Sequence, residues 1–161
     1  MNQSDDEIPT IGLGQYFEDM TVGRRFKTIG RTITEPDIVN FINTTGMVEV
    51  LFTNYEFLKN DSDIKGRLSP GALVFTMAEG LLVQSTMQGT GFAFLGMTLN
   101  IMGPCIAGDT IHVEVEVTEA RRSKSRPNRG IVTTTNKVIK QDGTVVMIYT
   151  PTRMMKARTT G

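Results

Sequence analysis

The chain has 161 residues and a mass of 17.8 kDa, the size of one ordinary domain or one subunit of a small oligomer. Its 17 Lys and Arg residues balance 17 Asp and Glu residues, so bulk charge favours neither a nucleic-acid partner nor a membrane surface. A single cysteine and a single histidine exclude an internal disulfide, a cysteine zinc site and a multi-histidine metal site.

Residues 1–14 are polar, carry three consecutive acids and lack hydrophobic periodicity, which predicts a mobile tail and not a signal peptide. The apolar runs are much shorter than the ~18 residues of a transmembrane helix, so no membrane partner is expected. We therefore predict a reduced, cytoplasmic compartment, and one domain over residues 15–158.

The first half of this domain is predicted to contain one strand and one helix. Residues 24–34 are rich in Thr, Ile and Phe, which is typical of a strand. Thr34 is a good N-cap, Pro36 lies near the first helical position, and the apolar stripe that follows predicts a helix ending near Gly46. Residues 47–66 are predicted to be a loop, with a short helix around residues 55–59 as an alternative.

The dominant helix is predicted at residues 69–87, where Ser69 would cap the helix and Pro70 would begin it. Apolar residues occur on every face, so this helix should be buried on most sides. Glu79 is the one charge inside the apolar run, and its burial would be costly unless the carboxylate has a partner or lies near solvent.

Four strands are predicted after this helix, at residues 92–102, 111–117, 131–140 and 145–152. One long helix followed by four strands predicts an α+β domain in which an antiparallel sheet wraps around the helix. Such a sheet has an exposed edge and another face, which dimerisation would cover.

Five short motifs occur in order along the chain: QYFEDMTVG (15–23), TEPDI (34–38), GRLSPGA (66–72), GDTIHVEVEV (108–117) and SKSRP (123–127). Together they resemble the MaoC-like dehydratases, the R-specific enoyl-CoA hydratases of hot-dog fold, over residues 16–158. The resemblance implies a single hot-dog domain, with a long central helix wrapped by a curved antiparallel sheet. It also implies a homodimer or higher oligomer that binds an acyl-CoA thioester at the subunit interface, with coenzyme A as part of the substrate and no separate cofactor.

The sequence departs from this family at the residues that perform its chemistry. Family hydratases carry a Gly-Asp-x-Asn-Pro-x-His pattern, whose Asp and His activate the water that is added across the double bond. Laid onto residues 46–52, the pattern places Met47 at the Asp position and Phe52 at the His position, and neither side chain can exchange a proton. Together with Leu51, these residues predict a dry pocket floor for an acyl group, or core packing.

Three further positions are candidates for chemistry. The resemblance implies that a backbone N–H at Gly71 binds the thioester carbonyl, and the alternative is a glycine needed only for close packing. Glu79, two turns along the helix, resembles the catalytic acid of hot-dog thioesterases, with a structural carboxylate held by a neighbouring group as the alternative. Glu49 would be a lone general base if burial raised its pKa, or otherwise a solvated loop acid.

Five cations occur within nine residues and with no acid among them, and they are Arg121, Arg122, Lys124, Arg126 and Arg129. Coenzyme A carries a 3′-phosphate and a pyrophosphate that such a basic connector would pair with. A solvated hairpin loop is the alternative.

These features leave three functions open. The first is a MaoC-like hydratase or dehydratase with a non-standard active site that uses Glu49 or Glu79. The second is a hot-dog acyl-CoA thioesterase that uses Glu79. The third is a catalytically silent acyl-CoA binder, or a subunit paired with an active homologue, and the loss of both dyad residues makes this a serious alternative.

Overall fold

The computed structural model describes residues 8–158. Residues 1–7 of the predicted tail therefore lie outside the described residues. The end of that segment is attached to the domain, because Gly14 N–H donates a hydrogen bond of 2.7 Å to the Gln88 carbonyl. A side chain at Gly14 would collide with the carbonyl of Thr86, so the close approach requires glycine.

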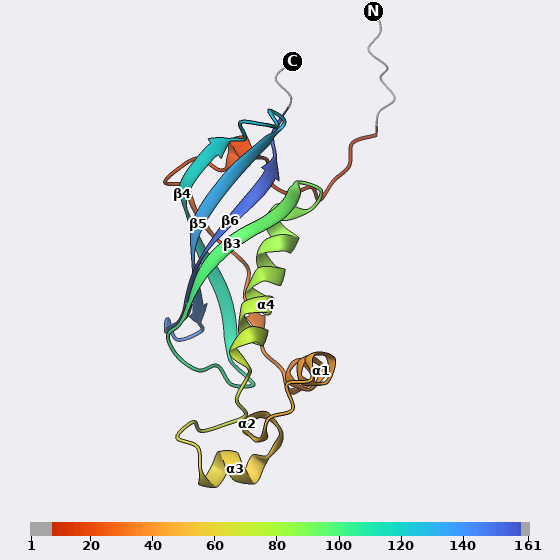
Figure 1. Ribbon diagram of the computed structural model, residues 1–161. Coiled ribbons are helices and arrows are strands. Elements are labelled where there is room, and N and C mark those ends of the chain that lie inside the picture. Colours follow the sequence, from red (N-terminus) through yellow and green to blue (C-terminus); the bar gives the residue numbers. More distant parts are fainter. Residues whose placement is uncertain (1–7, 159–161) are drawn as a thin grey trace, which may run out of the picture.

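The strands form one antiparallel sheet in the order β1-β4-β5-β6-β3, with β2 also paired to β4 (Figure 1). The strands are β1 (Arg25–Lys27), β2 (Arg31–Thr32), β3 (Gly91–Ile101), β4 (Thr110–Arg122), β5 (Arg129–Lys140) and β6 (Val145–Lys156). The strand predicted at residues 24–34 is thus two short strands. They separate at Thr28. Here the Val113 N–H donates to the Thr28 hydroxyl at 3.0 Å, in place of the backbone hydrogen bond that a continuous strand would accept.

The long helix α4 (Gly71–Leu82) lies along one face of the sheet and continues as one π-helical segment, Val83–Met87 (Figure 1). Six of its side chains are buried: Leu73, Val74, Met77, Ala78, Leu81 and Leu82. The N-cap position is held by Pro70, so the prediction that Ser69 caps this helix is wrong. The Ser69 side chain is buried, and its hydroxyl instead lies 3.4 Å from the Pro70 carbonyl.

Three shorter helices lie between β2 and α4, and they are α1 (Glu35–Thr45), α2 (Val50–Thr53) and α3 (Tyr55–Asn60). Thr34 is the N-cap of helix α1, as its sequence predicts, and Asp37 completes a capping box. It ends at Gly46, whose φ of 72° is left-handed. Residues 47–66, which are predicted as a loop with at most one short helix around residues 55–59, contain two short helices, α2 and α3.

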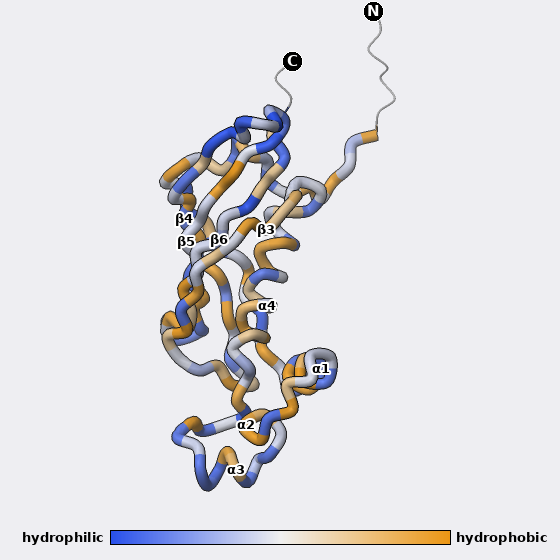
Figure 2. The backbone as a smooth tube through the Cα atoms, in the orientation of Figure 1, coloured by the Kyte–Doolittle hydropathy of each residue, from blue (hydrophilic) through white to orange (hydrophobic). Residues whose placement is uncertain are grey.

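The core lies between α4 and the inward face of the sheet, and α1 covers one end of it. Along β4, Ile111, Val113, Val115 and Val117 are buried, which confirms the predicted alternation. Figure 2 shows this alternation as changes of hydropathy along the strands. No helix among residues 8–158 is long and apolar enough to span a membrane.

Strand β3 is an edge of the sheet, and nearly all of its residues are exposed. Five of its large apolar side chains are between 42% and 60% exposed, and they are Phe92, Phe94, Leu95, Met97 and Ile101. An edge with unpaired backbone groups and apolar side chains is a template for pairing with another chain.

The packing of α1 gives a stability prediction. Ile38 is fully buried, whereas its neighbour Val39 is 40% exposed. Ile38→Ala should lower the free energy of unfolding by about 2–5 kcal/mol, because it leaves a cavity in the core. Urea denaturation measures this, with Val39→Ala as the matched control that should cost less than about 1 kcal/mol. Equal losses in the two variants would contradict the position of α1.

Candidate active site

A hollow of about 270 Å³ lies where the start of α4 meets the end of β3 and the helix α2. We call it the α4 pocket. It is lined by Phe52, Ile64, Leu68, Ser69, Gly71, Val74, Ile101, Gly103, Pro104, Cys105, Val146 and Met147. This lining is mainly apolar and contains no carboxylate, imidazole or cationic side chain. The volume is just below that of ordinary small-ligand sites, roughly 300–1,000 Å³.

Gly71 brings backbone donors to this pocket. It is the first residue of α4, and the N-cap Pro70 offers no side-chain cap. Among the described residues, the N–H groups of Gly71 and Ala72 have no hydrogen-bond partner, because the first bonds to the Pro70 carbonyl come from Leu73 and Val74. An added Cβ at Gly71 would lie 2.8 Å from Cδ1 of Ile101, so glycine keeps this approach open. Free amides at a helix start favour a carbonyl oxygen or an oxyanion.

The three apolar residues that the sequence predicts as a pocket floor lie in different places. Phe52 lines the α4 pocket and packs against the core. Met47 and Leu51 are half-buried and are not among the side chains that line it. The structure thus brings Gly71 and Phe52 together in one pocket. Met47 and Leu51 belong to the same segment as Phe52 but do not line the pocket.

Glu49 is exposed and acts as the N-cap of α2. Its carboxylate accepts the Leu51 N–H at 2.7 Å, and its carbonyl accepts the Thr53 hydroxyl at 2.9 Å. It does not line the α4 pocket. Its present role is local, because it satisfies one of the free N–H groups at the start of a very short helix.

Glu79 is held inside the fold by partners that the sequence analysis missed. Nη2 of Arg153 lies 2.6 Å from both carboxylate oxygens, and the Tyr149 hydroxyl donates to one of them at 2.8 Å. The side chains of Glu79 and Arg153 are 15% and 10% exposed. Burial, reinforced by the Glu79 charge, raises the pKa of Tyr149 far above its ordinary value, so this hydroxyl remains a donor.

The signal for these partners is the period of two in β6. Alternate residues of β6 point inward and are buried, and these include Met147, Tyr149, Arg153 and Met155. An inward-facing arginine opposite α4 was therefore predictable. Glu79 lies about 12 Å along the helix from Gly71 at 1.5 Å per residue. It is not among the side chains that line the α4 pocket.

Cys105 lines the pocket and is 2% exposed. Burial is the main reason that its pKa is raised to about 11, with a further contribution from the charge of Asp109. The thiol therefore stays protonated near neutral pH and is a poor nucleophile. Its place in the site is that of a small apolar wall residue.

The basic connector lies at the end of the sheet opposite the start of α4 (Figure 1). Arg122 pairs with Glu18 at 2.6 Å, and the guanidinium of Arg129 lies 4.1 Å from the centre of the Phe92 ring. Among residues 8–158, no ion pair involves Arg121, Lys124 or Arg126. Within one chain, the connector and the α4 pocket are therefore far apart.

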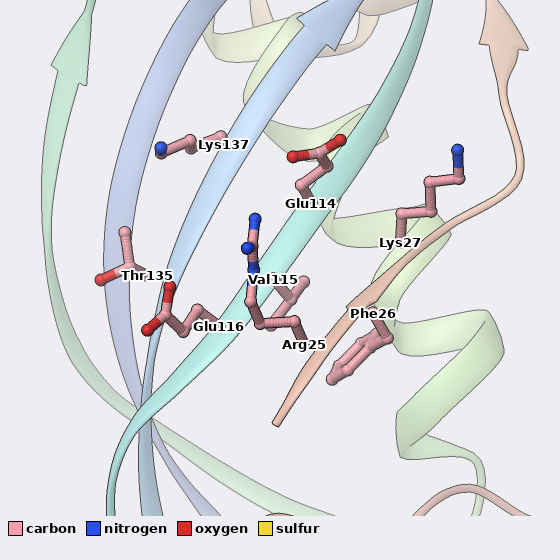
Figure 3. Close-up of a pocket in the computed structure, with 8 residues that line it drawn as sticks. All are labelled: Arg25, Phe26, Lys27, Glu114, Val115, Glu116, Thr135 and Lys137. Carbon is pink, nitrogen blue, oxygen red and sulfur yellow. The ribbon is translucent and has the colours of Figure 1, made fainter. Parts of the chain in front are cut away.

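A second hollow, of about 280 Å³, lies over β1 and the adjacent strands (Figure 3). It is lined by Arg25, Phe26, Lys27, Glu114, Val115, Glu116, Thr135 and Lys137. Its charges are of both signs, and none of the predicted site residues lies there. Within the described part of the chain, no group of three or more His, Cys, Asp or Glu side chains could hold a metal ion.

Comparisons with known proteins identify the class of this fold. A family model described as FAS1-like, dehydratase domain region, matches residues 20–149. The chain also aligns with a Mycobacterium tuberculosis structure described as a double hot-dog fold, with a TM-score of 0.84 and 21% identity over 95% of this chain and 47% of that one. The fold is therefore the α+β hot-dog fold that the sequence predicts.

Two further relatives define the family. A MaoC-like dehydratase structure from Rhodospirillum rubrum is 29% identical, with a TM-score of 0.78 over 91% of this chain and 99% of that one. A 3-hydroxybutyryl-CoA dehydratase from Methylorubrum extorquens is 28% identical over 104 residues, which are 65% of this chain. The aligned part spans 64% of that relative's length. The chain belongs to the MaoC-like dehydratase and R-hydratase family.

The Glu79–Arg153 pair gives a second prediction. Arg153→Met should lower the free energy of unfolding by about 3–5 kcal/mol, because it leaves a buried carboxylate without its cation. Adding Glu79→Gln to this variant should recover most of the loss. Chemical denaturation measures both changes. The control is Arg158→Met, which removes an exposed ion pair with Asp19 and should lower the free energy of unfolding by at most about 1 kcal/mol. If Arg153→Met costs no more than the control, the pair is not structural.

Proposed function

We propose that this chain binds an acyl-CoA thioester in the α4 pocket, with the carbonyl at the free amides of Gly71 and Ala72. The observation that carries this proposal is the junction of an apolar pocket with unpartnered helix N–H groups. The apolar walls would receive the acyl chain, and the amides would donate to the thioester oxygen. Kinship with a 3-hydroxybutyryl-CoA dehydratase supports this class of ligand.

The reaction class that this family supports is reversible hydration of an enoyl thioester. Water adds its oxygen to C3 and a proton goes to C2, and the reverse reaction removes both. The negative charge that develops on the thioester oxygen is what the two amides would stabilise. We infer a non-standard active site, because Met47 and Phe52 occupy the dyad positions and the α4 pocket has no acid–base side chain. Proton transfer by Glu49 or Glu79 would require either carboxylate to leave its present partners.

A catalytically silent binder, or a subunit that completes its site with an active homologue, is the second candidate. The apolar lining of the pocket favours it, because binding an acyl chain needs no proton donor while hydration does. The thioesterase alternative has less support. Both oxygens of Glu79 are occupied by Arg153, and a carboxylate in that state is a weak nucleophile or base.

We further propose that the chain is a homodimer joined along β3. Two antiparallel β3 edges would complete each other's hydrogen bonds and cover the exposed Phe94, Met97 and Ile101. Antiparallel pairing would also turn the connector end of one copy toward the pocket end of the other. The cations at residues 121–129 would then meet the phosphates of a coenzyme A whose acyl group lies in the second copy.

Ligand binding is tested first with unchanged protein and a panel of enoyl-, 3-hydroxyacyl- and saturated acyl-CoA thioesters. A thioester at ~100 times its dissociation constant should stabilise the fold by roughly 2.7 kcal/mol, visible as a thermal shift. Mass spectrometry then distinguishes the three candidate functions. A water adduct indicates a hydratase, release of free CoA that is lost in Glu79→Gln indicates a thioesterase, and no conversion indicates a silent binder. If no thioester shifts the melting temperature, the proposed ligand class is wrong.

The Gly71 amide is tested by Gly71→Pro against Gly71→Ala. Both variants add a Cβ beside Ile101, but only proline removes the N–H, and proline is favoured at the first helical position. Pro70 already has the extended backbone that a following proline requires. Affinity for the stabilising thioester should fall roughly tenfold more in Gly71→Pro, the value of one hydrogen bond. Equal affinities would exclude this amide as a carbonyl donor.

The dimer predicts a change of mass in solution. Met97→Glu places a charge in the centre of the proposed interface and should give monomers in sedimentation velocity, whereas unchanged protein sediments as a dimer. Val48→Glu, at an exposed apolar residue outside β3, is the matched control and should remain dimeric. A monomeric unchanged protein, or a dimer in Met97→Glu, would rule out the β3 interface.

A further inference from the structure

Arg67 connects three separate elements near the α4 pocket. Its Nε donates to both carboxylate oxygens of Glu35, at 2.9 and 3.0 Å, at the start of α1. Its Nη1 donates to the carbonyl of Phe52 in α2. Its guanidinium lies 5.3 Å from the centre of the Tyr55 ring in α3, and the Tyr55 hydroxyl donates to Glu35 at 3.0 Å. The Arg67 side chain is only 13% exposed.

The segment that Arg67 holds has few other attachments. Helices α2 and α3 have four and six residues, which is too short for stability by themselves. Among residues 47–60, Leu58 is the one buried side chain. Phe52, which belongs to this segment, forms part of the pocket wall. The position of this wall therefore depends strongly on the contacts of Arg67.

The chain fixes Arg67 itself from the other side. Its carbonyl accepts the Ala107 N–H at 2.8 Å, and the next residue, Leu68, forms a bridge with Ile106. Arg67 is thus anchored to the segment that leads into β4, while its side chain reaches α2. A cation at the last carbonyls of a helix is also favoured by the helix dipole.

We propose that Arg67 is a positioning residue that holds the α2 wall of the α4 pocket through the Phe52 carbonyl, and thereby sets the length of acyl chain that the pocket accepts. The effect on acyl-chain length rests on the proposed function, whereas the part of the proposal in which Arg67 holds α2 in place does not. Arginine suits this role because its planar fork donates to a carboxylate and a carbonyl at once. The compact ammonium group of lysine cannot reproduce the geometry of this planar fork.

Amide hydrogen exchange of the ligand-free protein tests the holding of α2. In Arg67→Met, the amides of Asn54 and Leu58 should exchange roughly tenfold faster or more, because a charge-assisted bond to α2 is lost. Arg67→Lys should show a smaller increase. Arg31→Met removes an exposed ion pair with Asp37 at the start of α1 and should leave both amides unchanged. Unchanged exchange in Arg67→Met overturns the proposal, and if that variant does not fold, Arg67→Lys decides by the same criterion.

Chain-length preference tests the effect on the pocket. Dissociation constants are measured for saturated acyl-CoA thioesters from butyryl to dodecanoyl in unchanged protein, Arg67→Lys and Arg31→Met. A looser wall should raise the affinity for the long relative to the short chains severalfold in Arg67→Lys alone, which a general loss of stability would not do. An unchanged preference overturns the specificity role. If unchanged protein binds no thioester, the proposed function fails, and the exchange experiment decides the role of Arg67.

Discussion

The burial of α4 against the inward face of the sheet is the constraint on which the rest of this structure depends. The helix is apolar on most sides, so it must be covered, and the long strands β4, β5 and β6 curve around it to do so. That packing also fixes where the helix begins. Its first amides emerge at one end of the sheet, between Ile101 and Phe52, and there the core opens into a pocket. Core and candidate site are therefore consequences of one interaction.

The polar contacts of Glu79 follow from the same packing. A carboxylate on a buried helix is costly without partners, and Arg153 and Tyr149 supply them from a single strand. These contacts favour one rotation of α4 about its axis, because any other would leave both Glu79 and Arg153 buried and unpaired. A residue that is needed in this way is poorly suited to accept a proton during turnover. The most conspicuous acid in the sequence is thus better explained by folding than by chemistry.

Much of the fold was predictable because its signals are local. The N-cap at Thr34, the glycine at 46 and the alternation along β4 each act within a few residues, and each prediction is confirmed. Three features were not local. The break at Thr28 depends on Val113, the partner of Glu79 lies 74 residues away, and the contact from Arg67 to α2 spans 15 residues. Composition also could not show where the five clustered cations lie, which is at the end of the sheet opposite the start of α4 (Figure 1).

The way in which α2 is held bears on how binding and catalysis relate in this fold. Arg67 contacts the backbone carbonyl of Phe52, so the side chain at that position can change while α2 stays in place. The proposed carbonyl site, in turn, is made of α4 amides, which no side-chain substitution in α2 alters. The resemblance, by contrast, implies proton transfer by two side chains of the loop that contains α2. If Met47 and Phe52 stand in place of those two residues, as we propose, an acyl group could still bind in the pocket without turnover, and no other change in the fold would be needed.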